Sequence, residues 1–324
     1  MDKKTAIIYG LGKRYYNDFF LKYLLPVIES KYEIIGVSDK ERISHKNDVP
    51  YRFIERSPEL RQSDFVIVTS DLYFEIIRDE LGCEFGIRNI ISIDDIEKEY
   101  IDDKLKAGLF KGLSGVEVGG PSYIFKYLYK QIRSCDGVNY SDSTVWWKDG
   151  GEGYSYDGSR LGNIILADAV DLSVIGDGSY EFCLSSNNLE HIANPLKAVK
   201  EFIRILMNSG LLLIIVPKKE ECFDHNRSVT AFNHLIDDFE NNTDEHDLTH
   251  LDEIMELHDF DMDPGVESAQ EFRRRAEDNY NNRCLHHHVF DEELLAMIYD
   301  FFDVEIIQKG ILFNNYYIIG RVQK

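Results

Sequence analysis

The most informative part of this chain reads Ser185-Ser186-Asn187-Asn188-Leu189-Glu190-His191-Ile192-Ala193-Asn194-Pro195. The apolar run Tyr180–Ser185 leads into it, and a helical pattern ending near Leu206 follows it. Asn208-Ser209-Gly210 then turns the chain into a second apolar run, Gly210–Val216. Two apolar runs joined by one helix predict buried parallel strands with a crossover, the basic unit of an α/β sheet.

The same stretch resembles the segment S-x-x-L-E-H-I-x-x-P of class I S-adenosylmethionine-dependent methyltransferases, which is followed by a helix, a turn and a strand ending in proline. The similarity extends backward through Asp168-Ala169, Leu172 and Asp177-Gly178-Ser179-Tyr180-Glu181-Phe182, and it covers about Leu113 to Pro217. Each piece alone is weak, but their order and spacing are specific in combination. The resemblance implies a methyltransferase enzyme with S-adenosylmethionine as its cofactor.

Two strand–glycine openings lie about one hundred residues apart. The first is Thr5–Tyr9 followed by Gly10-Leu11-Gly12, and the second is Gly115–Val118 followed by Gly119-Gly120-Pro121-Ser122. Each opening continues into a helical pattern and a further strand. We therefore predict two Rossmann-like α/β units, with a small domain over residues 1–106 and a methyltransferase domain over residues 107–324.

The apolar runs predict the elements of both units. In the first unit we expect strands at Thr5–Tyr9, Glu33–Ser38, Phe65–Thr69 and, at the edge, Asn89–Ser92, with helices at about Tyr15–Ser30, Leu72–Leu81 and Ile93–Lys106. In the second we expect strands at Gly115–Val118, Gly137–Tyr140, Gly162–Ala167, Tyr180–Ser185 and Gly210–Val216, and an antiparallel edge hairpin from Val304–Leu312 and Tyr316–Val322. Residues 218–290 are polar, acidic and histidine-rich, and they predict one large helical insertion.

The resemblance also implies the position of the cofactor. Ligands of open α/β sheets lie beyond the carboxyl ends of the strands, so it places the methionine part at Glu117 and its loop, the ribose at Asn139 and the adenine near Asp168. The predicted cofactor-binding residues are Glu117, Gly119, Gly120, Pro121, Ser122, Asn139, Asp168, Ala169, Ser185, Ser186 and Asn187. Two features depart from the family: the loop reads E-V-G-G-P-S, and Asn139 replaces an acid, which removes a charge-assisted bond to ribose.

A closer similarity lies downstream. Phe223–Arg227, Asp247–Ile254 and Asn282–Asp291 resemble stretches of methyltransferases encoded with bacterial surface-polysaccharide genes. This similarity implies O-methylation of a sugar or sugar-attached group in the synthesis of capsule, O-antigen or a similar glycan, with a sugar, nucleotide-sugar or glycan as the acceptor partner. The alternative is a non-catalytic protein of glycan assembly that binds a nucleotide-sugar through a methyltransferase-like fold.

Eight of the ten histidines lie between His225 and His288. A sugar hydroxyl must lose a proton as the methyl group arrives, and histidine titrates in the working pH range. We therefore predict His191, His225 and His287 as catalytic residues, and Arg227, His286 and His288 as acceptor-binding residues. Since no H-E-x-x-H spacing occurs, we predict no metal site, although the clustering leaves metal binding as an alternative.

The first glycine loop matches the dinucleotide-binding fingerprint only in part. Tyr15 stands where the third glycine of G-x-G-x-x-G belongs and hinders close packing of helix on strand. Asp39, after the second strand, is where a ribose-binding acid belongs. We predict no NAD binding; the unit either holds a nucleotide-sugar or is a structural or dimerisation module without a ligand.

The composition of the chain argues against several classes of binding partner. A formal charge of −22 and a pI of about 4.8 argue against nucleic acids and anionic membranes, and we interpret Arg273–Arg275 as a solvated helix face. Five cysteines without a C-x-x-C pair fit a reducing cytoplasm, where we expect the protein. The longest apolar runs are too short for membrane insertion, and the sequence leaves a homo-oligomer open.

Overall fold

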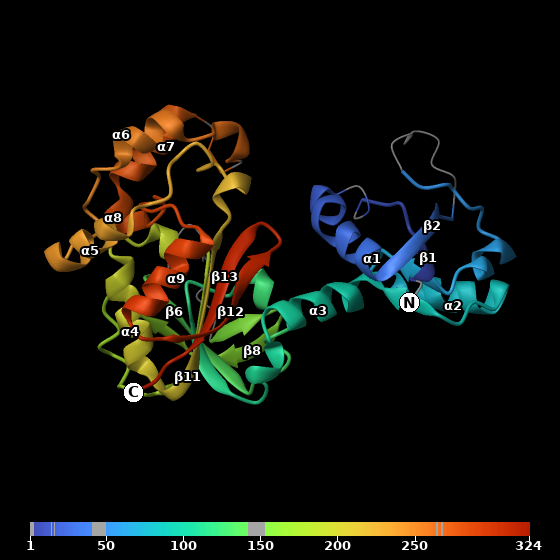
Figure 1. The fold of residues 1–324 in the computed structure, drawn as a ribbon, viewed down its shortest axis with the longest axis horizontal. Helices are drawn as coiled ribbons and strands as arrows, with labels where there is room; N and C mark the ends of the chain where they lie inside the picture. The colour runs from blue at the N-terminus through green and yellow to red at the C-terminus, as the bar shows by residue number, and fades with distance from the viewer. Residues whose placement is uncertain are drawn as a thin grey trace. The chain divides into compact units, whose positions relative to one another are not determined.

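The computed structural model describes residues 3–13, 15, 17–40, 50–141, 153–263, 265–266 and 268–324. The chain divides into two compact units, Met1–Asp103 and Lys104–Lys324, against a predicted boundary after residue 106 (Figure 1). None of the helices in these ranges is long and apolar enough to cross a membrane.

The first unit is built on a parallel sheet with the order β2-β1-β3-β4. Its strands are β1 (Lys4–Tyr9), β2 (Tyr32–Ser38), β3 (Phe65–Val68) and the edge strand β4 (Ile90–Ser92), all at predicted positions. The helical elements are η1 (Phe20–Leu24), α1 (Leu25–Lys31), η2 (Pro58–Gln62), α2 (Phe74–Phe85) and α3 (Ile93–Lys104). The first helix begins later than predicted, because the Asn17 side chain accepts a hydrogen bond from the Phe19 amide and caps the chain there.

The second unit has a seven-stranded sheet with the order β12-β13-β11-β10-β5-β6-β9. Its strands are β5 (Ser114–Val118), β6 (Ser134–Asn139), β9 (Ile164–Leu166), β10 (Tyr180–Ser186), β11 (Leu206–Pro217), β12 (Glu305–Leu312) and β13 (Asn315–Arg321). Of these, β13 is antiparallel to both of its neighbours, and the pairs from β11 to β9 are parallel. The predicted α/β fold with an antiparallel edge hairpin is therefore confirmed.

Two local predictions in this unit are wrong. The chain after β5 contains the short turn η4 (Tyr123–Phe125) instead of a helix, and it buries Phe125 and Tyr129 beneath the loop. The run predicted as one strand at Gly162–Ala167 is divided. Its first residue ends the hairpin β7 (Tyr154–Tyr156) and β8 (Ser159–Gly162), a separate small sheet, and its remainder forms β9. Tyr154 of this hairpin lies over Gly137, where any Cβ would come within 2.0 Å of the tyrosine ring.

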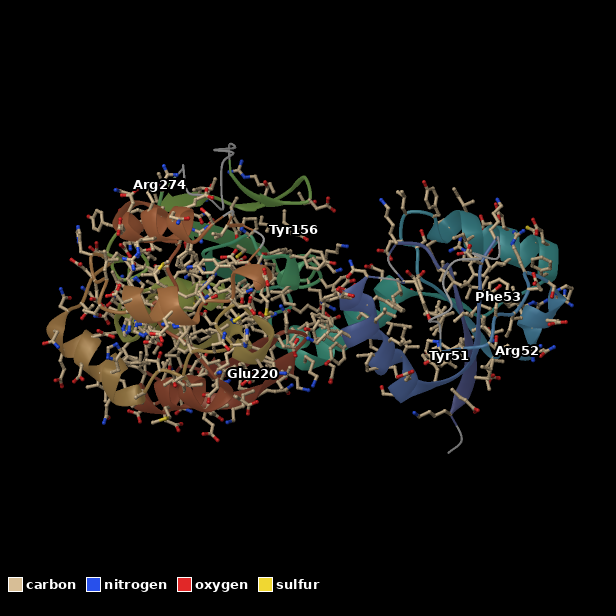
Figure 2. All side chains as sticks on the ribbon, turned by 90° about the horizontal axis from the view of Figure 1, so that it is seen from above. Tyr51, Arg52, Phe53, Tyr156, Glu220 and Arg274 are labelled. Atoms are coloured by element: carbon tan, nitrogen blue, oxygen red, sulfur yellow. The ribbon has the colours of Figure 1, made fainter. Side chains whose placement is uncertain are left out.

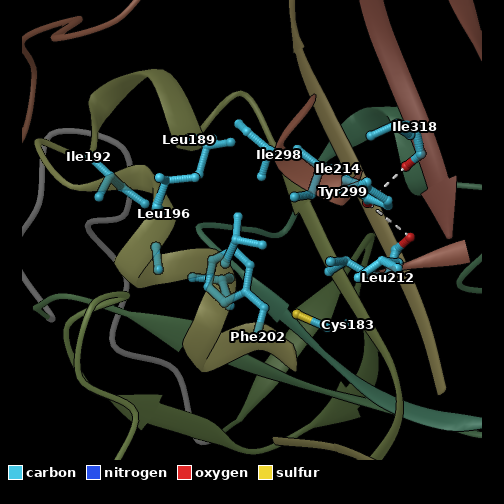
Figure 3. Packing of buried hydrophobic residues seen from close by; sticks show 14 of the residues in the cluster. Cys183, Leu189, Ile192, Leu196, Phe202, Leu212, Ile214, Ile298, Tyr299 and Ile318 are labelled. Atoms are coloured by element: carbon cyan, nitrogen blue, oxygen red, sulfur yellow. Dashed lines mark hydrogen bonds between the residues drawn. The ribbon is translucent and has the colours of Figure 1, made fainter. Parts of the chain in front are cut away.

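The core of the second unit lies between the sheet and two helices, α4 (Pro195–Ile205) and α9 (Glu292–Phe301) (Figure 3). Phe202 of α4 is fully buried, and burial of such a side chain stabilises the fold by about 1.5–3 kcal/mol. On α9 the buried Tyr299 hydroxyl lies 3.2 Å from the Leu212 carbonyl and 3.3 Å from that of Ile318, so it joins the helix to β11 and β13.

The insertion leaves β11 at Pro217 and caps this end of the sheet (Figure 1). It is helical as predicted, with η6 (Lys219–Glu221), α5 (Phe232–Asn241), α6 (Leu251–Leu257), η7 (Phe260–Met262), α7 (Ala269–Glu277) and α8 (Asn279–Asn282). Its own small core includes Ile254, Phe272 and Leu285. Arg274 is exposed and points away from the protein (Figure 2), which agrees with a solvated helix face.

Candidate active site

The strand order of the second unit reverses between β5 and β10, and such a reversal marks the ligand crevice of an open α/β sheet. Gly119 follows β5 with a φ of +88°, a conformation that favours glycine. Any Cβ there would lie 2.6 Å from the Asn188 side-chain oxygen, so the loops after β5 and β10 are in close contact. This contact brings the two predicted cofactor loops together.

Glu117 anchors the glycine loop from below. Its Oε1 accepts a hydrogen bond from Ser122 (2.6 Å), and its Oε2 accepts from Tyr129 (2.6 Å) and Tyr154 (2.7 Å). The side chain is fully buried, and this burial raises its pKa despite the three donors. The carboxylate and the Ser122 hydroxyl are thus engaged within the loop, and the contact of Glu117 with the methionine part of the cofactor stays a prediction. The predicted loop residues Gly120 and Pro121 lie directly above it, since a Cβ at Gly120 would reach 2.2 Å from the carboxyl group.

Asn139 offers the clearest opening for a ligand on this edge. It ends β6 and is 8% exposed, and its Nδ2 has no hydrogen-bond partner among the residues that the structure describes. A buried amide without a partner is costly, whereas a ribose hydroxyl can accept from it. On the other side of β5 lie the buried predicted residues Ser185 and Ser186, followed by Asn187, whose φ is +47°. These groups fit the adenosine part of a cofactor.

Asp168 follows β9 and is engaged by the insertion. Its Oδ2 lies 2.9 Å from Nη2 of Arg283, and its Oδ1 accepts from the Val170 amide at 3.1 Å. Arg283 also contacts Glu245 (3.2 Å) and stacks on the Tyr140 ring, 3.8 Å from its centroid. Asp168 therefore ties the insertion to the sheet edge; its role beside adenine, with Ala169 next to it, stays a prediction.

A small pocket lies where β11 passes into the insertion. Within it, His286 Nδ1 lies 2.5 Å from Asp224 Oδ2. This pair lowers the pKa of Asp224 to about 2, while Asp224 outweighs burial and raises the pKa of His286. Because Nδ1 donates to the carboxylate, Nε2 of His286 is left to act on a ligand. The pocket is lined by Glu190, Pro217, Lys219, Cys222, Asp224, His286, His288, Val289 and Phe290.

Glu190 and His191 reach the same point from the loop after β10. The His191 ring packs edge-on against His286, with centroids 4.4 Å apart, and its pKa is lowered by burial. Glu190 is 2% exposed, and neither carboxylate oxygen has a hydrogen-bond partner in the described part of the chain. Burial raises its pKa to about 7. One ligand atom each from Glu190, His191 and His286 lie within 4.8 Å of one another, a group able to accept a proton or to hold a cation.

Other residues predicted for this site have structural partners instead. The Arg227 guanidinium is 2% exposed and is bonded to Asp224 and to the carbonyls of His286 and His287, so it has no open face for an acceptor. His287 turns toward Glu245 (3.2 Å) and Asn279 (3.0 Å) inside the insertion. His225 bonds Asp259 at 2.8 Å, and His288 lies 3.2 Å from the Ala193 carbonyl. Of the three predicted catalytic histidines, only His191 lies in the Asp224–His286 cluster.

Asp224 and Glu190 were not predicted as site residues. Both lie in stretches already singled out, and Asp224 stands three residues before Arg227, a spacing that signals an ion pair. Their approach to His286 depends on the return of the chain after α8, which sequence periodicity does not reveal.

The glycine loop of the first unit is closed by its own acid. Asp39 accepts hydrogen bonds from the amides of Leu11 (2.6 Å) and Lys40 (2.6 Å), and the Thr69 hydroxyl donates to the Gly10 carbonyl. Tyr15 is buried, at 1% exposed. The carboxylate predicted as a ribose-binding acid is therefore engaged with the loop backbone.

Comparison with known proteins agrees with the geometry of the second unit. Residues 116–214 match the family model of a methyltransferase domain, and no curated protein matches the chain. Among solved structures, the chain is similar to a SAM-dependent methyltransferase from Aquifex aeolicus (TM-score 0.39, 13% identity, 78% of this chain and 98% of that chain). It is also similar to a possible histamine N-methyltransferase from Thermotoga maritima (TM-score 0.39, 17% identity, 70% and 89%). A third similar structure is a SAM-dependent methyltransferase from Methanosarcina mazei (TM-score 0.38, 15% identity, 66% and 93%).

Proposed function

We propose that this S-adenosylmethionine-dependent methyltransferase methylates a hydroxyl of a sugar, or of a sugar-attached group, during bacterial surface-glycan synthesis. The observation that carries the proposal is the buried Asp224–His286 pair, which lines a small pocket beside the loop after β10. A hydroxyl acceptor needs such a base, whereas a carbanion or thiolate acceptor does not. The resemblance of the insertion to polysaccharide-linked methyltransferases supports a sugar as the carrier of that hydroxyl.

Each group has a defined task in this reaction. When bound, S-adenosylmethionine supplies an electrophilic methyl group on a sulfonium; Asn139, Ser185 and Asn187 would hold its adenosine part. The acceptor hydroxyl donates its proton to Nε2 of His286, and Asp224 stabilises the imidazolium that forms by accepting from Nδ1. Glu190 and His191 line the same point and orient the acceptor by hydrogen bonding.

The direct test is mass analysis of products after incubation with S-adenosylmethionine and candidate nucleotide-sugars. With the true acceptor, His286→Ala should reduce turnover by roughly 10²–10⁴-fold, the usual contribution of a general base. Cofactor affinity, measured by calorimetry, should stay unchanged in this variant and also report that it is folded. Asp224→Asn should also reduce turnover strongly, because the carboxylate no longer fixes the Nδ1–H tautomer that leaves Nε2 of His286 able to accept the proton.

The matched control is His246→Ala. His246 lies in the same insertion, but its side chain is 66% exposed and pairs with Asp244, so turnover should be that of the wild type. Equal turnover of His286→Ala and wild type would rule out His286 as the base. Methylation of an amine or thiol, with no methylated sugar among the products, would overturn the proposed acceptor class.

A further inference from the structure

Three histidines from three segments of the insertion converge on one point. His234 lies on α5, His250 directly precedes α6, and His288 lies in the extended segment before α9. One ligand atom from each lies within 4.8 Å of the other two. Methyl transfer as proposed above uses none of these three rings, so the cluster needs its own explanation.

Three of the distances between polar atoms here are close to those within a coordination sphere, and Asp238 adds a carboxylate beside the three histidines. His234 Nε2 lies 2.9 Å from His250 Nε2 and 3.3 Å from Asp238 Oδ2. The same carboxylate oxygen lies 3.6 Å from His288 Nε2. A tetrahedral zinc ion with bonds of about 2.0–2.1 Å holds neighbouring ligand atoms about 3.3 Å apart. The three distances of 2.9, 3.3 and 3.6 Å lie on both sides of this value.

Hydrogen bonds within the cluster leave some of its buried polar atoms without a partner. Asp238 is 6% exposed, and its Oδ2 has no hydrogen-bond partner among the residues whose positions are described. The two facing nitrogens of His234 and His250 share at most one proton in their neutral forms. His288 Nε2 has the Ala193 carbonyl at 3.2 Å as an alternative partner, but that bond does nothing for Asp238. A single cation would satisfy the carboxylate and the ring nitrogens together.

The surroundings also suit a metal. His250 Nδ1 faces the Glu253 carboxylate at 3.9 Å, in the position of the outer carboxylate that orients many metal-bound histidines. His234 and Asp238 stand four residues apart on α5, so one helix face presents both ligands.

We propose that His234, Asp238, His250 and His288 bind one divalent transition-metal ion of the zinc type. Three imidazoles and one carboxylate favour zinc over magnesium or calcium, which prefer all-oxygen sites. Four protein ligands complete a tetrahedron, so the ion is structural and joins α5, the start of α6 and the segment carrying His286. This proposal departs from the sequence-based prediction of no metal, and it does not depend on the identity of the methyl acceptor.

The test begins with the full-length wild-type protein. Elemental analysis after purification should find one zinc ion per chain. Protein stripped with a chelator should bind Zn²⁺ in calorimetry, rise in melting temperature on binding, and give the strong visible absorption of tetrahedral cobalt with Co²⁺. Mg²⁺ should produce none of these changes. Failure of the stripped wild type to bind Zn²⁺ or Co²⁺ would overturn the proposal.

Two variants locate the site. His234→Ala and His250→Ala should lose the zinc ion and the cobalt spectrum, and both positions are only partly buried, which favours folded variants. Retained binding of S-adenosylmethionine would show that the variants are folded. His246→Ala is the matched control and should keep one zinc ion. Zinc retained in both His234→Ala and His250→Ala would overturn the assignment, and it is the result expected if Glu190, His191 and His286 held the ion instead.

Discussion

The two units open on the same pattern, a buried strand followed by a glycine loop, yet the loops differ in what they leave for a ligand. In the first unit, Asp39 accepts hydrogen bonds from the Leu11 amide of the glycine loop and from the amide of Lys40, its own neighbour in the chain. In the second, Glu117 also binds its own loop, but Asn139 on the next strand keeps a buried donor without a partner among the described residues. The glycines are alike, whereas the groups at the strand ends differ: a carboxylate bound to backbone amides and the small Ser38 hydroxyl in the first unit, and an amide donor without a described partner in the second.

This difference teaches where to look for a ligand site. A glycine at positive φ shows only that the backbone turns tightly, which serves a loop closed on itself as well as one closed on a phosphate or ribose. A buried polar atom without a partner is a stronger sign, since folding tolerates it only where something else satisfies it. By this criterion the second unit has an opening at Asn139, and the first unit has one at Ser38, whose fully buried Oγ at the end of β2 also lacks a partner among the described residues.

The largest effect is expected on stability, at Glu117, the buried residue that anchors the glycine loop of the second unit. Glu117→Ala removes the acceptor of three hydroxyl donors and should lower the free energy of unfolding by at least about 3 kcal/mol, since each buried donor left unsatisfied costs about 1–3 kcal/mol. Denaturant unfolding monitored by tyrosine fluorescence measures this loss. An Ala variant as stable as the wild type would show that the loop does not depend on its anchor.

Glu117→Gln is the control that isolates the charge. The pKa of Glu117 in the folded protein is raised above its ordinary value of 4.5, so its contribution to stability is full below that value and is lost as pH rises through the raised pKa. The stability of the wild type should therefore fall relative to the Gln variant as pH increases above 4.5. A stability difference that stays constant with pH would contradict this assignment.

An intermediate effect is expected on cofactor affinity, at Asn139, whose buried amide donor has no partner among the described residues. Asn139→Ala should weaken S-adenosylmethionine binding by about 0.5–1.5 kcal/mol, the value of one neutral hydrogen bond, and leave unfolding nearly unchanged. Calorimetry with S-adenosylmethionine and with S-adenosylhomocysteine measures both affinities. Asn281→Ala, on the insertion and bonded only to Asp278 among its described side-chain partners, is the control with unchanged affinity. If Asn139→Ala bound the cofactor as tightly as the wild type, the sheet edge at β6 would not be part of the site.

The sequence predicted the framework of both sheets because apolar strands and crossovers follow from residue patterns. It failed where side-chain packing outweighs local pattern, as after β5, where Phe125 and Tyr129 are buried without forming a helix. The site was predicted less well. Residue types alone pointed to Arg227 and His287, but their orientation is decided by buried partners: Asp224, three residues before Arg227, and Glu245, which lies 42 residues before His287. The convergence of His234 with His288 across 54 residues has no local signal at all.

The smallest effect is expected at the loop anchor of the first unit. Asp39 is only partly buried, and the amides that it binds lie near solvent, where water replaces a lost acceptor. Asp39→Ala should therefore cost about 1 kcal/mol or less in unfolding and leave the affinity for S-adenosylmethionine unchanged. Calorimetric titration of the wild type with NAD and NADP should show no binding, because the Asp39 carboxylate is occupied and Tyr15 fills the position of the third fingerprint glycine. Micromolar binding of NAD by the wild type, lost in Asp39→Ala, would reverse the comparison: it would mean that a ligand displaces the loop amides from the acid, and that a closed loop in the free protein does not exclude a dinucleotide site.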